Sequence, residues 1–219
     1  MRWLPVLILI CGMGSGLWAQ SRDKWEISGV GGGSFYRDVA ASGDNPPRSA
    51  KVGFFNGLAA GVVLGQTGRE HWGGEFHYLF QTNNMRLRAA SGTSGAAAFA
   101  AQSHSFHYDV LLYTARREAT IRPFIAGGPG LKLYQASGQE HALQPLLDIV
   151  DLSLQNQLKF LISGGGGVKV KISQHAQFRV DFRDYVTGIP GKSFAAVPGV
   201  KLAGQFHNLV GTAGIGIVF

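Results

Sequence analysis

The sequence predicts an all-β fold, an eight-stranded antiparallel up-and-down transmembrane β-barrel. Three observations predict it: apolar and polar residues alternate with a period of two, glycines are concentrated inside the alternating runs, and short and long connections alternate along the chain. Glycine accounts for 32 of the 219 residues, about twice its usual share of roughly 7%. Glycine within strands allows bends and close backbone approach, which a small closed barrel needs.

The first 19 residues have the organisation of a secretory signal peptide. Arg2 is followed by the apolar run Leu4–Ile10, and the small residue Ala19 stands at the expected cleavage point. The apolar run is much shorter than the roughly 20 residues that a membrane-spanning helix needs, and no later stretch reaches that length. We therefore expect residues 1–19 to be cleaved and residues 20–219 to form one barrel domain that crosses a membrane with strands.

The clearest strand is His71–Gln81, in which Trp72, Phe76, Tyr78 and Phe80 alternate with polar residues. A period of two this regular favours a strand over a helix. Similar alternation predicts strands over residues 51–65, 105–112, 176–186 and 208–219, and less regular alternation predicts strands over residues 25–36, 120–134 and 158–172.

Two prolines, Pro123 and Pro129, fall inside the predicted strand 120–134. Proline cannot donate a hydrogen bond to a β-ladder. We therefore expect a β-bulge at these positions.

The connections between the predicted strands differ in length in a regular way. Three are short, at residues 66–70, 115–119 and 173–175, and four are long, at residues 37–50, 82–103, 135–157 and 187–207. In an eight-stranded barrel this order places all the short connections at one end and all the long ones at the other. Outer-membrane barrels show this asymmetry, with short periplasmic turns and long extracellular loops.

The long connection 135–157 supports two interpretations. Apolar residues at helical spacing favour an amphipathic helix, with Pro145 suited to its first turn: Leu143, Leu146, Leu147, Val150 and Leu154. Leu152 and Leu154 also alternate with polar residues, which favours an extension of the strand hairpin instead.

The last predicted strand, NLVGTAGIGIVF, resembles the closing strand of outer-membrane barrels. Ile215, Ile217 and Phe219 match the alternating hydrophobic residues and terminal phenylalanine that the barrel-assembly machinery recognises in such strands. The segments RPFIAGGPGLKLY, SGGGGVKVKIS and QFRVDFRDYV resemble strands five to seven of the OmpA/OmpX-like eight-stranded family. The resemblance covers essentially residues 20–219. Together with the Sec-type signal peptide, it implies a location in the outer membrane of a Gram-negative cell envelope. The sequence departs from the full-length OmpA pattern by stopping at the last strand, so a wall-anchoring role through a peptidoglycan-binding domain is not implied.

The net charge and the spacing of the basic residues indicate which kinds of partner to expect. The chain has 20 basic and 13 acidic residues and a net charge of +7. The basic residues are spread singly along strands, so we expect no nucleic-acid partner. For an exported barrel we expect the positive charge to attract anionic lipopolysaccharide in the outer membrane. The other expected partners are outer-membrane lipid, the barrel-assembly machinery and an extracellular ligand bound through the long loops.

If the aromatic faces meet lipid, the opposite faces point into the lumen. Eight strands leave an interior only just wide enough for side chains, so we expect a packed polar plug. Buried charges must be paired, and we expect the acidic members to be bridged by the arginines and neighbouring lysines. The network could be static or could act as an ion gate, and we favour the static form. Its predicted members are Glu75, His77, His107, Asp109, Arg122, Lys169, Lys171, Arg179, Asp181 and Arg183.

The histidines raise the question of a metal site. His71, Glu75 and His77 share one face of a strand, but His71 and His77 lie about 20 Å apart along it, at roughly 3.3 Å per residue. That separation is too large for one ion. We expect no metal and no cofactor.

Ser105, His107 and Asp109 also share a strand face, and a lipid A deacylase or acyltransferase would need such residues near the barrel rim. Residues two apart on a strand are common, so this pattern is weakly specific. The favoured prediction is a non-enzymatic barrel with a structural or surface-interaction role. The alternatives are a lipid-modifying enzyme and a narrow gated conductance.

Overall fold

The computed structural model describes residues 24–44, 47–67, 70–89, 96–137, 146, 148–153 and 155–219. The predicted signal peptide, residues 1–19, lies outside this part of the chain. The described residues form strands and turns and contain no helix. In particular, they include no helix long and apolar enough to cross a membrane.

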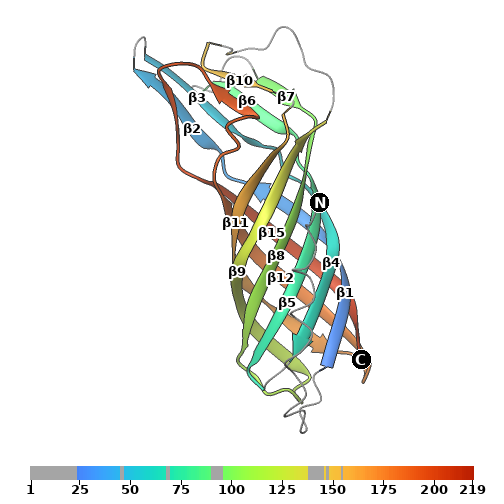
Figure 1. Ribbon diagram of the computed structural model, residues 1–219. Helices are drawn as coiled ribbons and strands as arrows, with labels where there is room; N and C mark the ends of the chain where they lie inside the picture. The colour runs from blue at the N-terminus through green and yellow to red at the C-terminus, as the bar shows by residue number, and fades with distance from the viewer. Residues whose placement is uncertain are drawn as a thin grey trace, which may run out of the picture.

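Eight strands form a closed antiparallel barrel (Figure 1). Each barrel strand pairs with the barrel strands that come before and after it in the sequence, so the topology is up-and-down, as predicted. The first and last strands close the ring, and Trp25 and Phe219 exchange two backbone hydrogen bonds of 2.9 Å. The barrel strands are β1 (Lys24–Tyr36), β4 (Gly57–Thr67), β5 (Trp72–Thr82), β8 (Ala101–Tyr113), β9 (Ile121–Ala136), β11 (Gln157–Lys171), β12 (Ala176–Thr187) and β15 (Phe206–Val218).

The outer wall of the barrel is apolar, whereas the inner wall carries the buried charged and polar side chains together with some apolar ones, such as Val63 and Leu161. On β8 the outward Phe106 is 54% exposed, whereas the inward Ser105 and Asp109 are fully buried. Large apolar side chains are exposed in the same way around the barrel, including Phe76, Ile125, Phe160, Phe182 and Ile215. An apolar outer wall around a polar interior is the pattern of a lipid-facing barrel.

The long connections are largely folded, and their prediction as loops is wrong over these parts. One end of the barrel, which we call the loop end, carries a five-stranded sheet of order β14-β2-β3-β6-β7 (Figure 1). The opposite end, with the short connections, is the turn end. The sheet strands are β2 (Val39–Asp44), β3 (Pro47–Phe54), β6 (Met85–Ala89), β7 (Ala96–Phe99) and β14 (Val200–Ala203).

The predicted strand 51–65 is in fact two strands. β3 ends at Phe54 in the loop-end sheet, and β4 begins at Gly57 in the barrel. A side chain at Gly57 would collide with the carbonyl oxygen of Thr82, so the close approach at this bend requires glycine. The alternation continues on both sides of the bend, which is why the sequence pattern did not reveal it.

The connection 135–157 contains a strand, and the helix interpretation is wrong there. β10 (Val150–Leu152) pairs with β13 (Phe194–Ala196) rather than extending a barrel hairpin. Val150 and Leu152 are fully buried. Leu143, Pro145, Leu147 and Leu154 lie outside the described residues.

No bulge occurs at the two prolines of β9, so that prediction is also wrong. Pro123 and Pro129 pair with β11 in one continuous register. On the β8 side the ladder stops after His107 and resumes at Val110 in the same register. Because proline has no N–H to donate, the ladder is interrupted there without an inserted residue.

An apolar core closes the loop end of the barrel. Phe54 lies at its centre, with its ring centroid 4.7 Å from that of Tyr36 and 5.4 Å from those of Tyr134, Phe194 and Phe206. Residues from the barrel, the loop-end sheet and the β10–β13 pair all contribute to this core. The folded connections therefore form a packed cap over the lumen.

Candidate functional site

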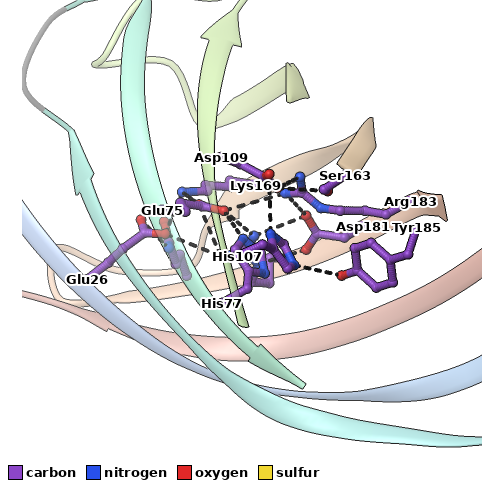
Figure 2. Close-up of polar contacts among 12 residues, drawn as sticks. Glu26, Glu75, His77, His107, Asp109, Ser163, Lys169, Asp181, Arg183 and Tyr185 are labelled. Atoms are coloured by element: carbon purple, nitrogen blue, oxygen red, sulfur yellow. Dashed lines mark hydrogen bonds and ion pairs between the residues drawn. The ribbon is translucent and has the colours of Figure 1, made fainter. Parts of the chain in front are cut away.

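A network of charged side chains fills the barrel lumen (Figure 2). We call it the lumen network. Its charged and histidine members are Glu26, Glu75, His77, His107, Asp109, Lys169, Arg179, Asp181 and Arg183, all of which are buried. These residues lie on the inward faces of five barrel strands: β1, β5, β8, β11 and β12.

Arg179 of β12 is the centre of the network. Its Nη1 and Nη2 atoms lie 3.2 and 2.9 Å from the two carboxylate oxygens of Glu75 on β5. Its Nε donates to Asp181 Oδ2 at 2.8 Å and its Nη2 to Asp181 Oδ1 at 3.0 Å. Its Nη1 also lies 3.4 Å from Glu26 Oε1, so three carboxylates surround one fully buried guanidinium, an arrangement that Arg supports through its planar fork of donors.

Glu26 of β1 belongs to the lumen network but was not among its predicted members. Lys169 contacts its carboxylate and also lies 2.6 Å from Glu75 Oε1, and Gln177 donates to Glu26 Oε2 at 2.6 Å. The available signal was its position between Trp25 and Ile27, which are exposed on the outer wall. The glycine-rich remainder of β1 obscured that alternation.

The two buried histidines extend the network across the lumen. His77 Nε2 lies 2.9 Å from Glu75 Oε2, and its ring stacks on that of His107 with centroids 4.5 Å apart. His107 Nε2 lies 3.0 Å from the Tyr185 hydroxyl. The imidazoles thus connect the Glu75 side of the network to Tyr185 on β12.

A second ion-pair centre lies beside the histidines. Arg183 contacts Asp109 and lies 3.2 Å from Asp181 Oδ1. Ser163 donates to Asp109 Oδ2 at 3.2 Å. Asp181 therefore links the Arg179 and Arg183 centres into one continuous network.

A second polar layer lies nearer the loop end. Lys132 is fully buried and donates to Gln81 Oε1 at 2.6 Å. Its Nζ lies 5.0, 5.5 and 5.8 Å from the ring centroids of Tyr36, Tyr134 and Tyr185. None of the ion pairs found among the described residues includes Lys132. Lys132 was not among the residues predicted to line the lumen.

Comparison with known proteins identifies the fold. Neisserial surface protein A aligns with a TM-score of 0.50 at 9% identity, over 89% of this chain and 96% of that one. The outer membrane protease OmpT from Escherichia coli aligns with a TM-score of 0.50 at 9% identity, over 90% and 97%. The N-terminal β-barrel domain of Pseudomonas aeruginosa OprF aligns with a TM-score of 0.47 at 10% identity, over 91% and 100%. No family model and no curated protein matches the sequence.

The chain has the fold of a small outer-membrane β-barrel. In the predicted closing strand, the side chains of Ile215, Ile217 and Phe219 are 64%, 59% and 66% exposed. They belong to the apolar outer wall, as the resemblance to a closing strand implies.

Two predicted members of the lumen network lie at its edge instead. Arg122 stacks on the Tyr113 ring, 3.8 Å from its centroid, and donates to the Glu70 carbonyl at 3.1 Å. It pairs with none of the buried carboxylates in the described structure, so its predicted bridging role is wrong. Lys171 is exposed. Both line a cavity of about 230 Å³ at the turn end, because strand residues this close to the rim reach solvent.

Ser105, His107 and Asp109 share the inward face of β8 but do not form an accessible catalytic site. All three are buried, and Ser105 Oγ has no hydrogen-bond partner in the described part of the chain. His107 Nδ1 lies 3.2 Å from Asp109 Oδ1, and Nε2 faces Tyr185 rather than Ser105. The described residues also contain no cluster of three or more metal-ligating side chains.

Proposed function

We propose that the protein is a non-enzymatic outer-membrane β-barrel with a closed lumen and a structural or surface-interaction role at its extracellular face. The observation that carries the proposal is that the lumen is filled by the paired charges of the lumen network and covered by the apolar cap. The function would then belong to the loop end, where long connections fold into a platform.

The lumen network supports a barrel that does not conduct. An ion crossing the lumen would have to separate Arg179 from Glu75 and Asp181, all of them nearly or fully buried. Separating buried partners leaves uncompensated charges, which is strongly unfavourable. The static form of the network is therefore favoured over an ion gate.

The conductance test uses purified protein in planar lipid bilayers. We expect no stepwise currents from the parent protein. Regular current steps that vanish in a preparation heat-unfolded before reconstitution would overturn the closed lumen and favour the gated conductance instead.

The proposed location places the loop end outside the cell and the short connections in the periplasm. Fractionation of expressing cells should find the protein in the outer membrane, with its gel mobility changed by boiling. Mass spectrometry should find a mature chain beginning at Gln20 if residues 1–19 are cleaved. A soluble periplasmic protein without the mobility shift would overturn the proposal.

The non-enzymatic role is supported by the burial of Ser105, His107 and Asp109, since a substrate cannot reach these three side chains. The fold does not decide whether the protein is an enzyme, because a protease has a similar fold. We expect the mass spectrum of lipid A from expressing cells to match that of cells without the protein. A change in acylation that depends on Ser105 would favour the lipid-modifying enzyme.

A further inference from the structure

A groove on the outward side of the loop-end sheet is lined mainly by cations. We call it the basic groove. It has a volume of about 350 Å³ and is lined by Tyr36, Arg37, Asp38, Ala40, Lys51, Arg86 and Arg88. Four of these seven residues are basic and one is acidic, so the groove has a positive formal charge.

One carboxylate holds two of the guanidinium groups in place. Asp38, in the bend between β1 and β2, contacts Nη2 of both Arg86 and Arg88. A side chain at Gly53 would collide with the Asp38 carboxylate, so this glycine gives Asp38 the room to reach β6. The arginines are therefore positioned before any ligand binds, which lowers the entropic cost of binding.

Like charges face each other across the strands of the groove. Lys51 on β3 pairs directly with Arg88 on β6, and both side chains are exposed on the same face of the sheet. Like charges directly opposite each other destabilise a sheet. An anion between them would relieve that repulsion, and phosphate groups are well matched to arginine.

The groove adjoins the apolar outer wall. Phe35, Phe55 and Leu58 are 48%, 39% and 73% exposed, and the guanidinium carbon of Arg86 lies 4.9 Å from the Phe55 ring centroid. A ligand that carries both phosphate and acyl chains could contact the groove and the wall together. A soluble polysaccharide would use only the charges.

We propose that the basic groove binds a phosphate of a phosphorylated glycolipid in the outer leaflet, of the lipopolysaccharide type. The inference rests on the proposed function, because it requires the loop end to face that leaflet. It adds a named ligand class and residues: Arg37, Lys51, Arg86 and Arg88 face the phosphate, and Asp38 positions the last two.

The test measures binding of detergent-solubilised diphosphorylated lipid A to the purified, folded protein. The double variant Lys51→Gln/Arg88→Gln should weaken binding by at least tenfold, whereas Lys171→Gln at the turn end should not change it. Dephosphorylated lipid A should bind the parent protein as weakly as diphosphorylated lipid A binds the double variant. Boiling-dependent mobility checks that each variant is folded.

Other outcomes separate the possible failures. Equal binding of phosphorylated and dephosphorylated lipid A would overturn the inference. Binding of heparin that is lost in the double variant, with lipid A binding unchanged, would assign the groove to a soluble polyanion and also overturn it. A parent protein with no mobility shift would overturn the proposed function itself, whereas a folded parent without phosphate-dependent binding overturns this inference alone.

Discussion

Arg179 and Glu75 face each other across the lumen in a two-point contact, with nitrogen–oxygen distances of 3.2 and 2.9 Å. The two residues are 104 positions apart in the chain and come from β12 and β5. Their pairing ties opposite sides of the barrel together through its interior. Interior polar contacts thus join opposite walls of the barrel, in addition to its buried apolar clusters.

Replacing Arg179 with methionine should lower the free energy of unfolding by about 3–5 kcal/mol, because Glu75 and Asp181 would stay buried without this cation. Urea unfolding in detergent micelles, followed by gel mobility, measures the change. The double variant Arg179→Met/Glu75→Gln should recover part of the loss. If the two single losses simply add in the double variant, the residues are not coupled.

The two buried lysines should respond in opposite directions to the same substitution. Lys169→Met should destabilise the barrel by about 3–5 kcal/mol, because it removes the cation shared by Glu26 and Glu75. Lys132→Met should stabilise it by about 1–3 kcal/mol, because Lys132 bonds to an amide among tyrosine rings and burial of its charge is costly. The same unfolding measurement compares them, and destabilisation by Lys132→Met would show that its contacts outweigh burial.

A charge on the outer wall should be unfavourable only in the membrane belt. Val180 on β12 is 46% exposed between Phe178 and Phe182. Val180→Arg should cost about 2–4 kcal/mol if this position faces the middle of a bilayer. Gln174→Arg, in the turn between β11 and β12, serves as the matched control and should be nearly neutral. Equal stability of both variants in lipid vesicles would contradict a lipid-facing wall.

Phe219 should matter more for assembly in cells than for stability. Its side chain is 66% exposed, so Phe219→Ala removes little packing from the folded barrel. If the assembly machinery recognises it together with Ile215 and Ile217, the variant should reach the outer membrane in smaller amounts. Quantification in membrane fractions tests this, with Ile172→Ala as an exposed apolar control. Equal amounts of Phe219→Ala and parent protein would contradict the role in assembly.

The barrel itself was predictable because its signal is local. Along β5 and β8 each residue faces either lipid or lumen, so a period of two appears directly in the sequence. The same parity placed Glu75, Asp109, Arg179, Asp181 and Arg183 on inward faces. It could not reveal which of them touch, because partners such as Asp109 and Arg183 come from different strands.

The loop-end structures were less predictable because their strands are short and their partners are distant. β10 pairs with β13, more than 40 residues later, and β14 joins the sheet beside β2 from the other end of the chain. The basic groove likewise joins Arg37, Lys51 and Arg88 from three separate segments. Neither the sheet nor the groove leaves a continuous pattern in the sequence.

The sequence by itself determined the fold class, the number of barrel strands and the two opposite faces of each barrel strand, because alternation and connection length can be followed along the chain. Only the tertiary structure decided which charges pair, that Glu26 belongs to the lumen network while Arg122 and Lys171 lie at its mouth, and that the long connections form a cap. Those outcomes depend on strand register and barrel closure, which bring together residues far apart in the chain.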